Sequence, residues 1–92
     1  MVTVELTRHL YELFPDLARR SLVMEASTVA DVVHQLEALA PGIGFYLCDE
    51  RGRLRRHVNI FVGEERVADR VGLSDRVGPG SRVFVMQALS GG

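Results

Sequence analysis

The chain has 92 residues, of which 47% are hydrophobic and 25% charged, and its formal net charge is −1. This length predicts a single domain with a modest core, and the composition excludes a disordered chain. The near-zero net charge gives no general attraction to nucleic acid or anionic lipid, so we expect neither as a partner. All 11 cationic residues are arginine, which excludes a Schiff-base lysine.

Cysteine and histidine usage narrows the function further. Cys48 is the single cysteine, so an internal disulfide and a cysteine zinc cluster are excluded. His9, His34 and His57 stand in different predicted elements without ligand spacing, so we predict no metal site. The chain start has no secretory signal pattern, and no run approaches the roughly 18 apolar residues that cross a bilayer. We expect a cytoplasmic protein with no membrane partner.

The first quarter of the chain predicts a β-hairpin. Residues 2–6 alternate between apolar and polar side chains, which is the period of a half-buried strand facing a core with Val2, Val4 and Leu6. Residues 7–20 are mixed, and both a turn of helix and a structured loop fit them. Residues 21–25 read as a second strand that pairs with the first.

A helix is predicted after Thr28. The Thr28 oxygen can accept an unpaired backbone N–H, and the Asp31 carboxylate suits the positive end of a helix. The apolar residues that come next follow the helical spacing: Val29, Val32, Val33, Leu36 and Leu39. Pro41 and Gly42 end the helix, which is amphipathic with one buried stripe.

Three segments follow this helix. Residues 43–47 are a short apolar connector, and residues 49–56, with Gly52 and four arginines, predict an exposed loop. Residues 57–62 give the clearest strand pattern, with the side chains of positions 58, 60 and 62 on one face.

The last third predicts a turn, a crossover and a final strand. Residues 63–65 form the turn, and residues 66–81 form a long crossover that holds Val71, Leu73 and Val77 and closes at a Gly-Pro-Gly turn. In the strand over residues 82–88, positions 83 and 85 face one way and Phe84 and Met86 the other.

This order of elements predicts an α+β fold. One helix must cover one mixed sheet of four to five strands, because no other element can bury its apolar stripe. The first and last strands are then central, parallel neighbours, as in the ubiquitin-like β-grasp fold. We expect residues 1–92 to form one such domain, with a flexible diglycine tail from about residue 88 to residue 92.

The chain ends in Gly91 and Gly92, directly after the final predicted strand. Glycine has no Cβ, so such a tail is slim and can enter a narrow active site. The terminal carboxylate is unreactive until it is joined to AMP, after which sulfur or amine nucleophiles can attack it. We therefore predict that the Gly92 carboxylate is the working group and that Gly91 gives the tail its slimness.

The pattern resembles the ThiS/MoaD sulfur-carrier family in its β-grasp order, in residues 73–85 and in the terminal residues 88–92. Residues 54–62 look most like the branch that serves cysteine biosynthesis. The resemblance implies that an E1-like adenylyltransferase uses ATP to activate Gly92, with no cofactor bound permanently to the carrier. A thiocarboxylate at Gly92 would then donate sulfide to a cysteine synthase-type, thiamin or molybdopterin enzyme. Ser90 departs from the alanine that is usual in this family.

A partner-binding face is predicted on the sheet. Strand parity places Phe61, Phe84 and Met86 on the face opposite the helix, where they form a candidate docking patch for the activating enzyme, continued by Leu89 and Ser90 of the tail. Two other interpretations stay open. Residues 10–15 can cover the three sheet residues, or each can be exposed singly.

Two further features each have a functional interpretation and a purely structural one. The arginines at positions 51, 53, 55 and 56 can bind a nucleotide, RNA or an acidic partner, but Asp49 and Glu50 dilute their charge, and a solvated loop is favoured. Cys48 can be a reactive thiol, but its apolar neighbours favour a half-buried small hydrophobe.

The sequence thus predicts a carrier and not an enzyme, although a role as the small subunit of a sulfur-transfer enzyme stays open. Two alternatives remain. One is a ubiquitin-like modifier that is joined to target lysines through Gly92, and the other is a β-grasp interaction module that is never activated.

Overall fold

The computed structural model describes residues 1–18 and 21–87. The elements in chain order are β1 (Val2–Leu6), α1 (Arg8–Leu13), α2 (Pro15–Ala18), β2 (Leu22–Met24), α3 (Val29–Leu39), α4 (Ile43–Leu47), β3 (Val58–Val62), β4 (Glu65–Arg66) and β5 (Arg82–Gln87). Within these ranges, no helix combines the length and the hydropathy that crossing a membrane requires.

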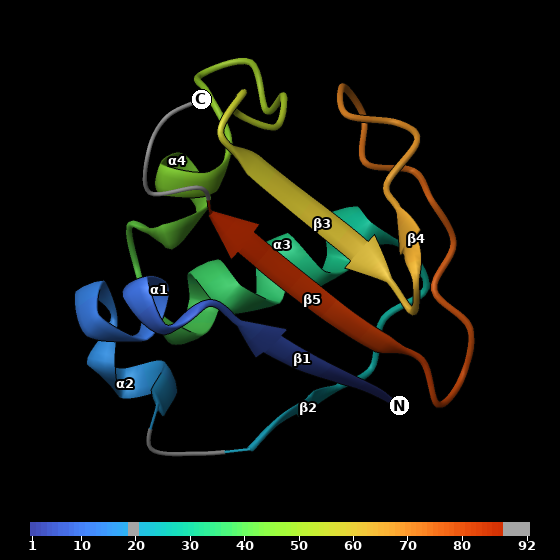
Figure 1. Cartoon of the computed structure of the whole chain (residues 1–92), viewed down its shortest axis with the longest axis horizontal. Coiled ribbons are helices and arrows are strands. Elements are labelled where there is room, and N and C mark those ends of the chain that lie inside the picture. Colours follow the sequence, from blue (N-terminus) through green and yellow to red (C-terminus); the bar gives the residue numbers. More distant parts are fainter. Residues whose placement is uncertain (19–20, 88–92) are drawn as a thin grey trace.

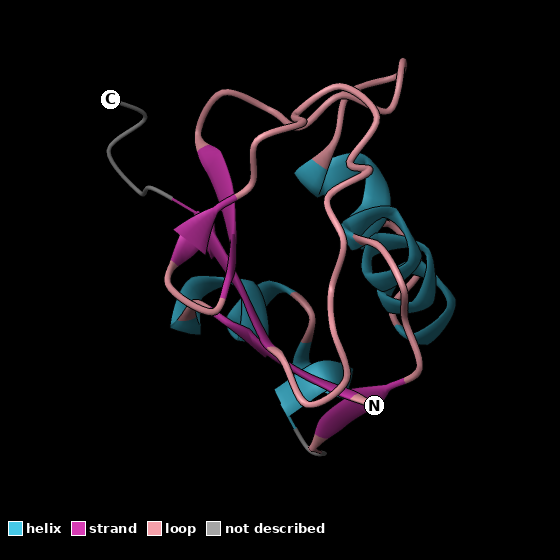
Figure 2. Cartoon of the chain, turned by 90° about the vertical axis from the view of Figure 1, so that its right-hand side faces the viewer, coloured by secondary structure: helices cyan, strands magenta, loops and turns pink. Residues whose placement is uncertain are grey.

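One mixed sheet of five strands organises the molecule, in the order β2-β1-β5-β3-β4 (Figure 1). β1 and β5 are parallel, with Val4 opposite Val83, and the other neighbouring pairs are antiparallel. The first and last strands are therefore neighbours in the middle of the sheet, as the sequence predicts. Figure 2 shows the sheet and α3 as two layers, and the core lies between them.

Helix α3 begins at the predicted cap. Thr28 Oγ1 accepts a hydrogen bond from the Asp31 N–H at 3.3 Å, and Asp31 Oδ2 accepts from the N–H groups of Ser27 and Thr28 at 2.9 and 3.1 Å. These backbone donors lower the pKa of the Asp31 carboxyl, because they favour its charged form. The reciprocal bonds are a capping box and fix where the helix starts.

The predicted apolar stripe of α3 is correct except at its end. Val29, Val32, Val33 and Leu36 are buried, whereas Leu39 is 37% exposed. Ala40 is buried in its place, because it follows Leu36 by one helical turn and lies nearer the centre of the stripe than Leu39 does.

The mixed segment after β1 forms the two short helices α1 and α2. Leu10 and Leu17 are fully buried and belong to the same core cluster as the inward residues of β1. Tyr11 Oη also accepts a hydrogen bond from the Leu6 N–H at 3.1 Å. These helices therefore extend the core and tie it to the end of β1.

Two predicted connections are more ordered than the sequence suggests. The apolar connector is the helix α4, and the expected exposed loop over residues 49–56 contains the buried Leu54, which forms an antiparallel bridge with Cys48. In the crossover, Leu73 and Val77 are buried as core residues, whereas Val71 is 66% exposed. Alternation cannot locate such contacts, because they depend on how loops fold back onto the helices.

Candidate functional site

The end of β5 is where the predicted tail begins, and backbone groups together with the Thr7 hydroxyl hold it on both sides. Gln87 pairs with Val58 at the start of β3. On the other side, the Thr7 N–H donates to the Val85 carbonyl at 3.0 Å, and the Gln87 N–H donates to Thr7 Oγ1 at 3.1 Å. The last residue before the tail is therefore fixed to the two neighbouring parts of the sheet.

A side-chain contact adds a third support. Gln87 Nε2 donates to Tyr46 Oη at 2.7 Å, and the Tyr46 ring packs edge-on against Phe14 with 5.8 Å between the ring centroids. Helix α4 and the segment between α1 and α2 thus both contribute to holding Gln87. Leu89, Ser90, Gly91 and Gly92 lie outside the described residues, so their predicted roles stay predictions.

We expect Thr7→Val to loosen the end of β5. The valine has a similar shape but cannot accept a hydrogen bond from the Gln87 N–H, nor donate the longer one, at 3.4 Å, that Thr7 Oγ1 gives to the Val85 carbonyl. The loss of the bond to Gln87 alone costs about 1 kcal/mol. Amide hydrogen exchange should become about fivefold faster at Gln87. Thr7→Ser keeps the oxygen and is the matched control. Equal exchange in the two variants would show that the hydroxyl does not hold the strand.

The sheet face opposite α3 brings the predicted docking residues together. Phe61 and Phe84 are direct cross-strand partners, and Met86 lies opposite Asn59 in the same pair of strands. All three predicted residues are half-buried. Leu10 is in the core on the other side of the sheet, which argues against the interpretation that residues 10–15 cover them. Their role in docking stays a prediction.

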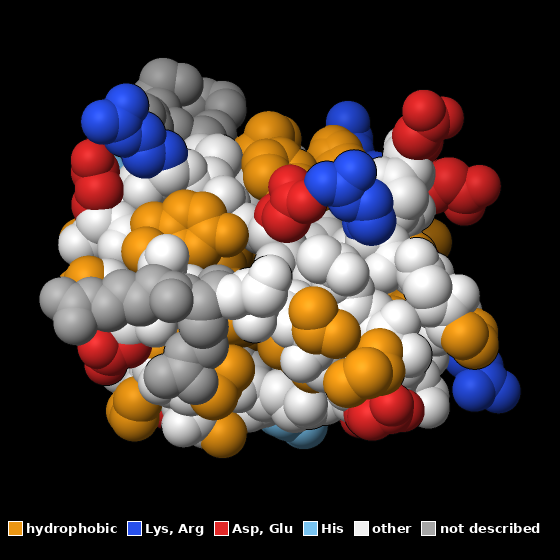
Figure 3. Space-filling view, turned by 90° about the horizontal axis from the view of Figure 1, so that it is seen from below, with side chains coloured by type: hydrophobic (Ala, Val, Ile, Leu, Met, Phe, Trp, Pro, Cys, Tyr) orange, Lys and Arg blue, Asp and Glu red, His pale blue; other side chains and the backbone are white. Residues whose placement is uncertain are grey.

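The large apolar side chains that are exposed rather than half-buried are scattered along the described chain: Met1, Leu13, Val23, Leu39, Phe45 and Val71. Figure 3 shows one side of the molecule, where apolar side chains form several separate groups among other atoms. Single exposed apolar residues are ordinary in folded proteins. The paired aromatic residues of β3 and β5 are therefore the more distinctive feature.

The Cys48 thiol is unsuited to nucleophilic chemistry. Its residue is only 6% exposed, and burial raises the pKa of the thiol, as does the neighbouring Asp49 charge to a smaller extent. A thiol with a raised pKa forms little thiolate, which is the reactive species. Cys48 therefore acts as a small hydrophobe, and it is more deeply buried than predicted.

Several residues at this end of the sheet were not singled out from the sequence. Thr7, Tyr46 and Gln87 hold the strand end, and Arg70 fixes the approach to β3. The Arg70 guanidinium donates to Asn59 Oδ1 at 2.9 Å and to the carbonyls of Arg55 and Val58 at 2.7 and 2.9 Å. No spacing pattern in the sequence indicates these contacts, because the residues that make them are up to 80 positions apart in the chain.

The comparison with models of protein families identifies the family of this chain. The model of the ThiS family matches residues 4–92, which include every described strand from β2 to β5 and the two terminal glycines. The chain belongs to the ThiS family. This confirms the resemblance that the sequence pattern indicated.

Curated relatives of this ThiS family protein are sulfur carriers. It is 34% identical over 76 residues to the sulfur carrier protein CysO of Mycobacterium tuberculosis (strain H37Rv), a match that covers 80% of this chain and 82% of the relative. The same values hold for CysO of Mycobacterium bovis. These matches confirm the prediction of a sulfur carrier and the similarity to the CysO branch.

Solved structures confirm the β-grasp fold of this ThiS family protein. A chain of the Amycolatopsis orientalis BexX/CysO complex matches with a TM-score of 0.82 and 27% identity, covering 100% of both chains. Mycobacterium tuberculosis CysO matches with a TM-score of 0.80 and 32% identity, covering 97% of this chain and 100% of the other. Haloferax volcanii SAMP1 has a TM-score of 0.74 at 22% identity, over 99% and 98% of the two chains, and shows a shared fold alone.

Proposed function

We propose that this sulfur carrier works through the Gly92 carboxylate, which is adenylated and then converted to a thiocarboxylate. The observation that carries the proposal is the ThiS family match through residue 92, together with the firmly held strand end that precedes the tail. A rigid base and a slim end suit a group that must be presented in the active site of another protein.

The chemistry needs no catalytic side chain of the carrier. A carboxylate oxygen of Gly92 attacks the α-phosphorus of ATP, which forms the acyl-adenylate and releases pyrophosphate. Hydrosulfide, or its equivalent from a sulfur donor, then adds to the acyl carbon and AMP leaves. The ATP is bound by the activating enzyme, and the carrier is consumed and regenerated as a co-substrate. A small subunit of a sulfur-transfer enzyme would use the same chemistry and would differ from a carrier only by being permanently bound to the larger subunit.

Two kinds of partner follow from this proposal. An E1-like adenylyltransferase or sulfurtransferase charges the tail, and a biosynthetic enzyme accepts the sulfur. A cysteine synthase-type acceptor is favoured over molybdopterin and thiamin enzymes, because the curated relatives are CysO proteins. A neighbouring solved structure contains CysO in a complex with BexX, so a fold of this shape can bind a partner protein.

Intact-mass measurement on protein from its native cells tests the proposal. We expect a subpopulation that is heavier by the difference between one sulfur and one oxygen atom, with fragmentation placing the change at Gly92. Covalent adducts on lysines of other proteins would support the modifier alternative instead. A chain that acquires neither species in the presence of ATP and the activating enzyme would be an interaction module.

We expect Phe84→Ala to weaken docking to the activating enzyme. Truncation removes one ring of the Phe61–Phe84 pair, and loss of an aromatic docking residue costs about 1–2 kcal/mol of binding. The KM for the carrier in an adenylation assay should rise about tenfold. Leu39→Ala is the control, because Leu39 is partly exposed but lies on α3, in the other layer of the structure. An unchanged KM in a folded Phe84→Ala protein would remove this face from the interface.

A further inference from the structure

We propose that an arginine cluster beside the end of β5 docks an acidic segment of the enzyme that charges the tail. The cluster consists of Arg53, Arg55, Arg56 and Arg70. This inference rests on the proposed function, because it assumes that a partner protein handles Gly92. It adds a second, charged contact surface to the apolar face of the sheet.

The cluster surrounds a surface cavity of about 420 Å³. The remaining lining residues are Asp49, Leu54, His57 and Val71. Four arginines and one aspartate give this cavity a formal charge of +3, although the whole chain carries −1. The rest of the chain therefore carries −4, and positive charge is concentrated at one place.

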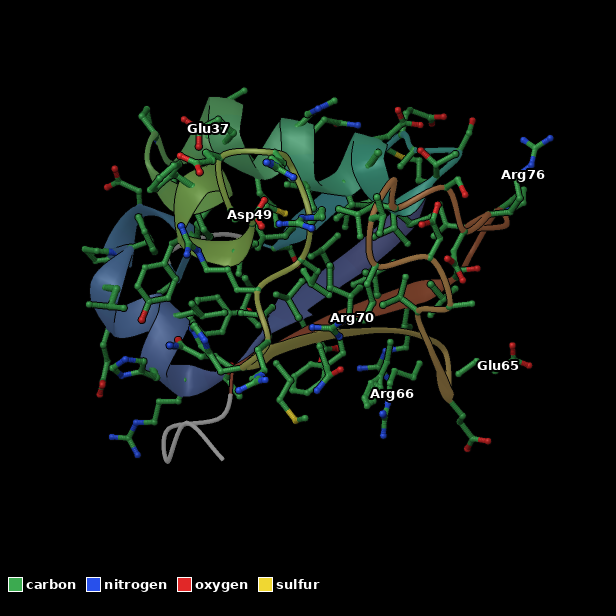
Figure 4. All side chains as sticks on the ribbon, turned by 90° about the horizontal axis from the view of Figure 1, so that it is seen from above. Glu37, Asp49, Glu65, Arg66, Arg70 and Arg76 are labelled. Atoms are coloured by element: carbon green, nitrogen blue, oxygen red, sulfur yellow. The ribbon has the colours of Figure 1, made fainter. Side chains whose placement is uncertain are left out.

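Local contacts hold three of these four guanidinium groups in place. Arg70 is fixed by its three acceptors around the start of β3. Arg55 Nε donates to the Phe45 carbonyl at 3.0 Å, and its guanidinium carbon lies 5.0 Å from the centroid of the Phe45 ring. Arg53 pairs with Asp49 at 3.2 Å. Figure 4 shows Asp49 and Arg70 within this part of the molecule.

The arrangement favours an extended acidic segment over a single small anion. Three of the four guanidinium groups already have separate partners, so they present charge over a surface and do not converge on one point. A long polyanion such as nucleic acid would also meet the −4 charge of the remaining chain. A short acidic stretch of a protein surface can contact the arginine cluster without meeting the negative charge of the remaining chain.

The position of the cluster connects it with the tail. Arg56 and His57 directly precede Val58, and Val58 pairs with Gln87, the last described residue of β5. Figure 1 shows the start of β3 and the arrowhead of β5 at the same end of the sheet. A protein that takes up residues 88–92 must approach this end, so an acidic segment of it can reach the arginines. Opposite charges there would speed and orient the encounter.

A charge reversal tests the inference in the adenylation reaction. Arg56→Glu changes an exposed arginine of the cluster, and Arg76→Glu makes the same charge change at an exposed site in the crossover, far from Asp49 in Figure 4. At low salt we expect Arg56→Glu to raise the KM for the carrier about tenfold with kcat unchanged, and to flatten its salt dependence. Equal KM values for the two variants would overturn the inference. If the wild-type chain itself is not adenylated, the proposed function fails instead.

A binding experiment checks the same surface without any enzyme. Hexaglutamate, added to isotope-labelled chain, should shift the backbone amide signals of residues 53–57 and 70, and hexaglutamine should not. Inorganic phosphate at the same charge concentration should act more weakly. Saturation by phosphate without a response to hexaglutamate would identify a small-anion site, and shifts spread over the whole chain would show non-specific attraction. Either result would overturn the docking role.

Discussion

Removal of Gly92 is expected to abolish adenylation while the thermal unfolding midpoint stays unchanged. Each residue of an extended chain spans about 3.5 Å, so the shortened tail ends that far from the reacting phosphorus. Reacting atoms must approach within about 3–3.5 Å, and a misplacement of 1 Å can already cost about 100-fold in rate. The last residue of the described core is Val85, seven positions before Gly92. Pyrophosphate release and calorimetry measure the two effects.

Gly92→Ala is the matched variant for this deletion. It keeps the length of the chain and the carboxylate, and adds only one Cβ. We expect adenylation to continue at a reduced rate. The added Cβ makes the end of the tail bulkier, but the carboxylate can still extend as far as in the original chain. Full activity of the shortened chain would place the reacting group elsewhere. Loss of the folded state in the shortened chain would mean that the tail is part of the structure.

The second large effect concerns stability. Leu36→Ala should lower the free energy of unfolding by about 3 kcal/mol, because it removes a fully buried side chain at the centre of the α3 stripe and leaves a cavity. For a chain of this size, that loss corresponds to a fall of about 15 °C in the unfolding midpoint. Urea and thermal unfolding measure both quantities.

Leu39→Ala is the control on the same helix. The chemical change is identical, but Leu39 is 37% exposed at the edge of the stripe, so we expect a loss below about 1 kcal/mol. Equal losses for the two variants would mean that Leu39 is buried after all and that the predicted five-residue stripe is correct. The pair therefore tests the correction as well as the core.

The functional surfaces differ in how far the sequence could predict them. Strand parity placed Phe61, Phe84 and Met86 on one face, because alternation is a local property of extended backbone. The buried position of Leu54 could not be predicted, since it follows from a bridge to Cys48 across a loop. The contact of Gln87 with Tyr46 joins residues 41 positions apart, and sequence periodicity carries no information at that separation.

Neighbouring residues were enough to predict the order of β1, β2, α3, β3 and β5, the cap of α3 and the diglycine end, because each is a local pattern: alternating side chains, a threonine with an aspartate three positions later, and two residues without Cβ. They did not predict α4 or β4. The tertiary structure alone decided which side chains hold the end of β5 and where the arginines gather. Those arrangements depend on the pairing of β1 with β5 and on Arg70 meeting the start of β3. Such contacts form only when distant segments pack together, so the physical information that specifies them is spread over the whole chain.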